Sequence, residues 1–388
     1  MKTGRLHIEI TGRLLALDGL RGLAALAVVL YHLSGHIKQE LSATIPQWMM
    51  TIFEYGFLGV PVFFVLSGFV IAASVKSSAV TIHYVGRFAL RRSIRLDIVY
   101  WSAIGLSLAL LWLKGEFMGL PISYPQFSEV AFHAFYLQDI FQVENQISTV
   151  FWTLCLEVQF YLFFILSIYA TTRINPINSL FMHSIVIAFL GIISSMIYAD
   201  IIMVSMPGLF LKYWIFFALG CLCYRSLTFG GCHSLLFSAV IAISLIVIVG
   251  SDKPNYIVAS TATVLFIYVL GVYGHLKRGL SNRYLQFLGM VSYSLYLTHP
   301  EIGWKSISVL ITIIPMKENP YGALLVLILG VVISILFSYF FYKLIEKPSH
   351  ALSKRIGLHQ SHPSVSTDMV GPVARPIHYL DNPVQERD

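Results

Sequence analysis

The first hydrophobic segment of the chain carries three side chains suited to acid–base or anion-binding chemistry. Arg21 and His32 are eleven residues apart in LDGLRGLAALAVVLYH, so on an α-helix they lie within roughly 20° of one face and about 16 Å apart along the axis. Asp18 precedes Arg21 by three residues and shares that face. Ionisable groups in a membrane helix normally face a bundle interior, where they bind a substrate or move a proton. We therefore predict that this segment forms one wall of a site; the alternative is a polar contact between helices.

A second candidate feature is a basic run, RFALRRSIRL, which contains four arginines within nine residues. They are Arg87, Arg91, Arg92 and Arg95. Guanidinium groups bind phosphates bidentately, so the run predicts an anion clamp. We place it on a loop that leads into a helix, with Arg92 and Arg95 on one face wherever the segment is helical. The alternative is topological, since cytoplasmic loops of membrane proteins are basic in any case.

Two further hydrophobic segments supply a hydroxyl group and a carboxylate. The segment YGFLGVPVFFVLSGF places Ser67 beside a glycine, where its hydroxyl can contact a ligand. FWTLCLEVQFY carries Glu157 and Tyr161 four residues apart, on one helix face. A carboxylate within a membrane helix needs a partner, and we predict His32 in that role. A polar packing cluster is the alternative for both segments.

The last two hydrophobic segments also carry polar side chains. In GMVSYSLYLTHP, the polar residues Ser292, Tyr296 and His299 share one helix face, and this stripe ends at a proline. We expect it either to line a substrate channel or to join two helices through hydrogen bonds. Tyr293, like Ser67, is a candidate for stabilising a reaction oxyanion. Glu346, in IEKP, is expected to pair with the arginine run or to order the anion site.

Composition identifies the environment of these residues. Of 388 residues, 57% are hydrophobic and only 12% are charged, against about 25% charged in soluble domains. The chain is therefore predicted to be an all-α, multi-pass membrane protein with about ten spans. The spans lie near 15–35, 56–75, 97–113, 152–171, 181–199, 207–226, 234–250, 256–274, 286–313 and 321–345. The net charge of +7 does not indicate nucleic-acid binding, because the basic residues lie mainly between spans.

The distribution of lysine and arginine predicts that both termini are cytoplasmic. Residues 1–14 are then a cytoplasmic segment, 15–348 the membrane core and 349–388 a disordered cytoplasmic tail. Residues 117–150 are too polar to span, and the span at 286–313 is expected to bend at Pro300. The four cysteines do not follow a standard zinc-binding pattern, so we expect no metal site.

Taken together, these motifs resemble acyltransferase family 3, whose members are polytopic membrane O-acyltransferases of surface polysaccharides and related glycans. The resemblance rests on the Arg21–His32 spacing, FFVLSGF, RRSIR, W-T-L-x-x-E-x-x-F-Y, SYSLYLTHP and the final E-K-P, and it covers roughly residues 12–348. It implies that His32 is the catalytic base, that Arg92 and Arg95 contact acyl-CoA, and that Glu157 is the acidic residue of the fourth span. One departure is Asp97, which places a negative charge near the clamp.

The resemblance implies an enzyme of the bacterial inner membrane that moves an acyl group, acetyl in the first instance, from cytoplasmic acyl-CoA to a glycan hydroxyl. Its partners are acyl-CoA, the glycan and the lipid bilayer, and no tightly bound cofactor is expected. Arg21 and the four arginines of the run bind the donor. Two alternatives come from other classes. One is a transporter of a lipid-linked sugar or anion, and the other is a haem protein with His32 and His299 as axial ligands, which the expected unrelated depths of the two histidines disfavour.

Overall fold

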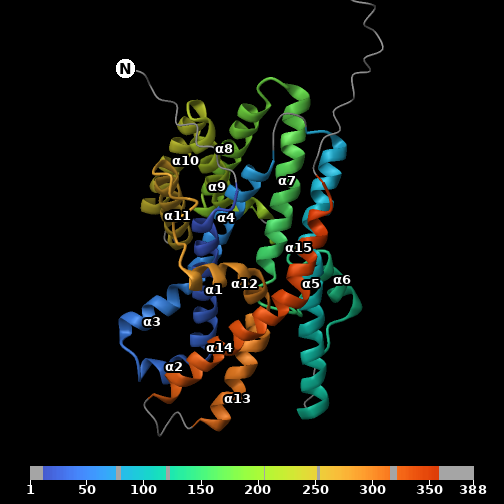
Figure 1. Cartoon of the computed structure of the whole chain (residues 1–388), viewed down its shortest axis with the longest axis vertical. Helices are drawn as coiled ribbons and strands as arrows, with labels where there is room; N and C mark the ends of the chain where they lie inside the picture. The colour runs from blue at the N-terminus through green and yellow to red at the C-terminus, as the bar shows by residue number, and fades with distance from the viewer. Residues whose placement is uncertain are drawn as a thin grey trace, which may run out of the picture.

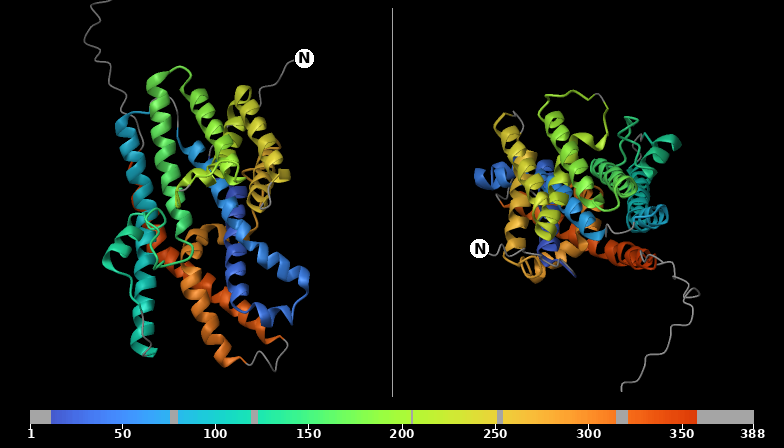
Figure 2. Two further views of the ribbon diagram at one scale, coloured as in Figure 1. Left: turned by 180° about the vertical axis from the view of Figure 1, so that it is seen from behind. Right: turned by 90° about the horizontal axis from the view of Figure 1, so that it is seen from above.

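The computed structural model describes residues 12–75, 80–118, 123–204, 206–250, 254–314 and 321–357, except the side chain of Met118 (Figures 1 and 2). Within these ranges the chain is helical and contains no strand. The helices are α1 (Leu15–His36), α2 (Lys38–Ser42), α3 (Gln47–Glu54), α4 (Gly59–Ser74), α5 (Ile82–Met118), α6 (Phe127–Ala134), α7 (Trp152–Ile174), α8 (Ser179–Tyr198), α9 (Trp214–Phe229), α10 (Cys232–Gly250), α11 (Asn255–Val272), α12 (Arg283–His299), α13 (Lys305–Ile313), α14 (Gly322–Phe341) and α15 (Lys347–Lys354). Two 3₁₀ turns (Tyr55–Leu58 and Phe210–Tyr213) and two π-helical turns (Pro300–Trp304 and Tyr342–Glu346) join consecutive helices.

Nine helical stretches of the described chain are long and apolar enough to cross a membrane, and each coincides with a predicted span. This confirms an all-α, multi-pass membrane protein. The remaining predicted span, 286–313, is helical throughout but does not belong to these nine. Its first part, α12, is buried from Val291 to His299 apart from the half-buried Tyr293, and it carries serine, tyrosine and histidine side chains. The chain changes direction after α12 (Figure 1), and the π-helical turn that begins at Pro300 accommodates the expected bend.

Two boundaries predicted from the sequence, the start of the third span and the start of the tail, differ from those in the structure. The third span was expected to start at residue 97, but α5 begins at Ile82, so the arginine run lies on a helix rather than on a loop. The tail was expected to be disordered from residue 349, but α15 continues to Lys354. Pro348 does not end the helix because it stands in the first turn of α15, where a missing N–H costs no hydrogen bond. Residues 358–388 and 1–11 lie outside the described ranges, so the predicted tail and N-terminal segment stay predictions there.

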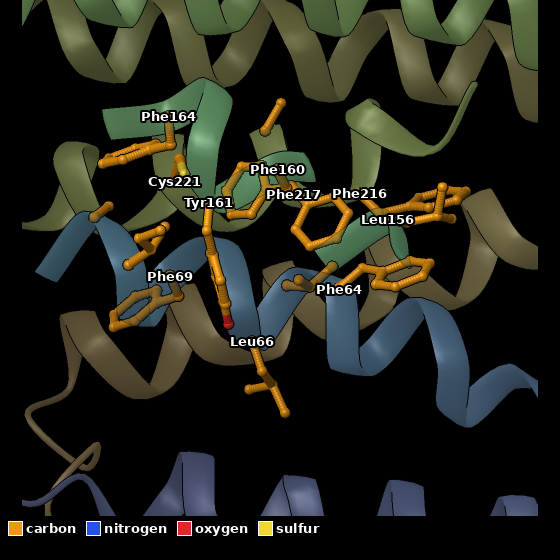
Figure 3. Close-up of a cluster of buried hydrophobic side chains, with 14 of the residues drawn as sticks. Phe64, Leu66, Phe69, Leu156, Phe160, Tyr161, Phe164, Phe216, Phe217 and Cys221 are labelled. Carbon is orange, nitrogen blue, oxygen red and sulfur yellow. The ribbon is translucent and has the colours of Figure 1, made fainter. Parts of the chain in front are cut away.

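Glycines let α4 and α9 pack in direct backbone contact. A Cβ atom at Gly68 would lie 2.1 Å from the carbonyl oxygen of Phe217, and one at Gly220 would lie 2.0 Å from that of Val65. Small residues of this kind allow close helix approach within a membrane. Aromatic rings from α4, α7 and α9 fill the space beside this contact (Figure 3), and the rings of Phe160 and Phe217 stack at 4.1 Å.

A second close contact joins α1 to α12. A Cβ atom at Gly289 would lie 2.2 Å from the backbone oxygen of Asp18, and one at Gly22 would lie 2.6 Å from the backbone nitrogen of Gly289. The two helices therefore touch at the level of Asp18 and Arg21. This contact places the polar face of α1 beside the polar face of α12, and the candidate site lies next to it.

Candidate active site

A cavity of about 440 Å³ lies between α1, α4, α5, α7, α12, the Tyr342–Glu346 turn and α15. Most of the residues singled out in the sequence line it. They are Asp18, Arg21, Ser67, Arg92, Arg95, Glu157, Tyr161, Ser292, Tyr293, Tyr296 and Glu346. Six segments that are distant in sequence thus supply one chamber, which we call the first cavity. His32, His299, Arg87 and Arg91 do not line it.

The carboxylate of Glu157 is the centre of a hydroxyl cluster in the first cavity. Its Oε1 atom accepts hydrogen bonds from Ser67, at 2.8 Å, and from the hydroxyl of Tyr161. Among the described residues, the other oxygen of Glu157 has no hydrogen-bond partner, so it can accept a hydrogen bond from a ligand. Figure 3 shows the ring of Tyr161 at the edge of the aromatic core, with its hydroxyl pointing away from the other rings.

Arg92 and Tyr161 extend this cluster across to α5. The guanidinium of Arg92 lies 4.9 Å from the centroid of the Tyr161 ring and also donates to Ser74 at 3.2 Å. A cation over an aromatic face is attracted by the ring quadrupole. The positive charge of Arg92 is thereby held on the wall of the first cavity, close to the hydroxyl groups that contact Glu157.

His32 does not contact Glu157, contrary to the sequence prediction. Its partner is His299, and Nδ1 of His32 lies 2.9 Å from Nε2 of His299. The assignment of the two histidines to unrelated depths was therefore wrong. The haem alternative fails for the same reason, because two imidazoles in direct hydrogen-bond contact leave no room for an iron atom between them.

Hydrogen bonds to the backbone set the tautomers of this histidine pair. Nδ1 of His299 lies 3.1 Å and 2.9 Å from the carbonyl oxygens of Leu295 and Tyr296. Carbonyl oxygens only accept, so Nδ1 of the neutral His299 carries the hydrogen and Nε2 is the acceptor. Nδ1 of His32 must then be the donor. Consequently, Nε2 of His32 keeps its lone pair, which is the state that a general base requires.

A third cluster connects α5, α12 and α15 through Glu346. The carboxylate is 3% exposed and accepts hydrogen bonds from the backbone N–H of Ser294 (3.2 Å) and from its hydroxyl (2.6 Å). Its other oxygen lies 3.7 Å from Nε2 of His350. That nitrogen accepts a hydrogen bond from Nε of Arg95 at 3.1 Å. Because this nitrogen accepts from Arg95, it has no hydrogen to donate to Glu346. The expected direct pairing of Glu346 with the arginine run is therefore not seen among the described residues, and His350 lies between the two groups.

The arginine run divides between the cavity and other surroundings. Arg92 and Arg95 point to the first cavity, whereas Arg87 and Arg91 do not contribute to its lining. This corrects the prediction of a clamp made by all four arginines, and it follows from the geometry of a helix. Because α5 turns by about 100° per residue, four positions spread over nine residues do not share one face.

Asp97 forms no ion pair with the arginine run among the described residues, and its carboxylate accepts hydrogen bonds from two neutral hydroxyl groups instead. Ser93 donates to one oxygen, and the hydroxyl of Tyr136 donates to the other at 2.8 Å. Burial is the main cause that raises the pKa of Tyr136 far above its ordinary value, so the hydroxyl remains a donor. The pair fixes the segment after α6 against α5.

Neither candidate for oxyanion stabilisation has a free hydroxyl hydrogen. Tyr293 donates to the backbone oxygen of Leu96 at 3.2 Å, and Ser67 donates to Glu157. The hydroxyl of Tyr296 lies 3.0 Å from Oγ1 of Thr153. Uncommitted donors on the cavity wall include the terminal nitrogens of Arg95, whose Nε atom alone has a hydrogen-bond partner among the described residues.

Sequence reasoning missed several residues of the site, among them Arg13, Ser294 and His350. Arg13 precedes α1 and donates to Asp18 at 2.7 Å, while Arg21 lies 3.8 Å from the same carboxylate. A signal for His350 was present, since it follows Glu346 by four residues and so shares its face in a continuous helix. That helix was not expected to continue past Pro348.

A family model described as an acyltransferase domain matches residues 14–343 of the chain. No curated protein and no solved structure matches the chain significantly. The matched range begins just before α1 and ends within the second π-helical turn, so it includes every helix of the candidate site except α15.

Proposed function

The chain belongs to this acyltransferase family, acyltransferase family 3, and on that premise we propose that it transfers an acyl group, acetyl in the first instance, from acyl-CoA to a glycan hydroxyl. As a multi-pass membrane acyltransferase it would carry out this reaction in the bacterial inner membrane. The donor would come from the cytoplasm and the acceptor would be presented at the outer face.

The observation that carries this proposal is the composition of the first cavity. It places a hydroxyl-bound carboxylate, Glu157, and two guanidinium groups held by hydrogen bonds, Arg92 and Arg95, on the lining of one cavity. Acyl transfer needs a proton acceptor near the attacking hydroxyl and a positive donor near the carbonyl oxygen that becomes negative. On these walls Glu157 can bind the acceptor, and Arg92 and Arg95 supply the positive donors, whereas the proton acceptor comes from outside the lining of the first cavity.

The proposed proton acceptor is Nε2 of His32. As the acceptor hydroxyl attacks the thioester carbonyl carbon, a C–O bond forms and the hydroxyl proton passes to His32. The C–S bond then breaks, and the thiolate takes that proton to leave as the free thiol of CoA. Since His299 lies one turn beyond the cavity-lining residue Tyr296, the histidine pair fits an acceptor that enters from the end opposite the donor.

Glu157 is proposed to hold the acceptor from the side of the first cavity. Its uncommitted oxygen accepts a hydrogen bond from an acceptor hydroxyl, while Ser67 and Tyr161 fix its other oxygen. Glu157 and His32 do not touch each other in the structure, so both act on the substrate and neither acts through the other.

The test uses the purified protein in lipid nanodiscs with acetyl-CoA. We expect release of CoA thiol that depends on an added glycan acceptor, with a matching mass increase on the acceptor. The transporter alternative predicts the opposite pattern: acetyl-CoA stays intact, and proteoliposomes accumulate a sugar or anion. Intact acetyl-CoA with every acceptor class would contradict the proposal.

A further inference from the structure

A second cavity, of about 760 Å³, lies where α1 begins and α4 and α9 end. It shares Arg13, Arg21 and Arg95 with the first cavity, so the two chambers adjoin. A single elongated ligand can therefore reach from one cavity into the other.

The lining of the second cavity is strongly positive. It contains four arginines and one carboxylate, which leaves an excess of three positive charges among the described lining residues. These charged residues are Arg13, Arg21, Arg95, Arg225 and Asp18. Asp18 cannot neutralise the set, because its two oxygens already serve Arg13 and Arg21.

Arg225 distinguishes this chamber from an ordinary basic loop. Arg225 is only 2% exposed, and its guanidinium donates to Nδ1 of His183 at 2.7 Å and to the hydroxyl of Ser184 at 2.8 Å. Within the described part of the chain, no carboxylate lies within ion-pair distance of Arg225. Its partners are thus neutral acceptors, which orient the guanidinium without compensating its charge.

Further hydrogen bonds hold these neutral partners in place. A guanidinium cannot accept, so Nδ1 of His183 is the acceptor and Nε2 carries the hydrogen, which points to Ser167 at 2.9 Å. Ser184 also contacts Nδ1 of His233 at 2.9 Å. A buried cation without an opposite charge is costly in a membrane bundle, and such groups normally mark a ligand site.

We propose that the second cavity binds the phosphate groups of a nucleotide-linked thioester, that Arg225 is a donor-binding residue, and that the acyl-carrying arm passes Arg21 and Arg95 into the first cavity. This inference rests on the proposed function. A pyrophosphate together with a phosphate monoester carries about three to four negative charges at neutral pH, which matches the excess positive charge of the lining. Arg95, whose terminal nitrogens are uncommitted, faces both chambers and can contact either part of the donor.

The test compares two thioesters, acetyl-CoA and S-acetyl-pantetheine, which carries the same reactive group without the nucleotide. Replacing Arg225 by glutamine (Arg225→Gln) should raise the KM for acetyl-CoA about tenfold or more, the loss expected for a charge-assisted hydrogen bond. The ratio of kcat/KM for acetyl-CoA to that for S-acetyl-pantetheine should fall by a similar factor. Arg225→Lys should recover part of the ratio because it restores the charge.

The matched control is Arg173→Gln. Arg173 lies in the last turn of α7, contacts the ring of Tyr169 and lines neither cavity, so the ratio should not change. An equal loss with both thioesters in Arg225→Gln would assign Arg225 to folding and overturn the proposal. A ratio that changes only when anionic lipid is added to the nanodiscs would identify a lipid headgroup as the phosphate source and would also overturn it.

A measurement on the wild-type protein gives an independent answer. Adenosine 3′,5′-bisphosphate should compete with acetyl-CoA but not with S-acetyl-pantetheine, because the two cavities can be filled at once. Competition with both thioesters, or with neither, would contradict a separate phosphate chamber. Failure of the proposed function looks different, since neither thioester would then be consumed by any variant.

Discussion

Nδ1 of His32 and Nε2 of His299 lie 2.9 Å apart, although 267 residues separate them in the sequence. The contact joins α1 to the last turn of α12, and two backbone carbonyls determine which nitrogen carries each hydrogen. In the proposed mechanism His299 plays the part that a carboxylate plays in many hydrolases, since it orients His32 and fixes its tautomer. It does so without adding a charge to the membrane interior.

His299 is expected to be a positioning residue, and two substitutions separate that role from packing. In His299→Gln the side-chain oxygen can still accept from Nδ1 of His32, so we expect substantial acyl transfer. In His299→Leu no acceptor remains, and kcat should fall about tenfold or more with an altered pH–rate profile. Steady-state kinetics across pH on both variants is the measurement. Equal activity in the two proteins would argue that the hydrogen bond has no role.

Glu157 and His32 are expected to act on the same acceptor molecule in one step, Glu157 by binding one of its hydroxyl groups and His32 by taking the proton of the hydroxyl that attacks. Glu157→Gln preserves the shape of the side chain but removes its charge, so kcat should fall by about 10²-fold or more. When His32→Ala is added, the combined loss should be smaller than the product of the two single losses, because groups that act in one step are not additive. Kinetics of the two single variants and the double variant measure this. Fully multiplicative losses would place the two residues in separate steps.

The arginine run should divide functionally as it divides in space. The double substitution Arg92→Ala with Arg95→Ala should raise the KM for acyl-CoA more than it lowers kcat, since both side chains line the first cavity. The same change at Arg87 and Arg91, which line neither cavity, should leave donor KM within about twofold. Unchanged donor affinity in the first double variant would refute the assignment of Arg92 and Arg95.

The contact between α1 and α12 should tolerate no additional atom at Gly289. Gly289→Ala places a Cβ atom 2.2 Å from the backbone oxygen of Asp18, so the helices must separate, at a cost of about 1–3 kcal/mol. The matched control is Gly105→Ala in α5, where a new Cβ atom meets nothing within 4 Å. Thermal unfolding in detergent should show a lower Tm for the first variant only. A Tm equal to that of the wild type in Gly289→Ala would mean that the helices are not held this closely.

Features that depend on local spacing could be predicted from the sequence. The spans follow from runs of apolar residues, and the pairing of Glu157 with Tyr161 follows from the helical repeat. The same repeat placed Asp18 beside Arg21, and it also explains why Arg92 and Arg95 line the cavity without Arg87 and Arg91, although all four were assigned to one clamp. Each of these relationships lies within one helix, where residue number alone determines the face.

Relationships between helices could not be predicted in this way. Glu157 contacts Ser67 rather than His32 because the glycine contacts of α4 and α1 set how each helix is rotated in the bundle. Burial of Arg225 was equally invisible, since a single arginine near the end of a span looks like any residue of a basic loop. These features depend on how helices pack, which one sequence does not display.

The most direct test of the central claim is mass spectrometry of surface glycans from cells that carry the wild-type gene, His32→Ala or no gene. Removing a histidine from a span does not hinder membrane insertion, so the variant should reach the membrane in normal amount. We predict an acyl-sized mass on the glycan with the wild type only. The claim would be contradicted by acylated glycan in the His32→Ala strain at the wild-type level, or by identical glycans in all three strains together with intact acetyl-CoA in the purified system.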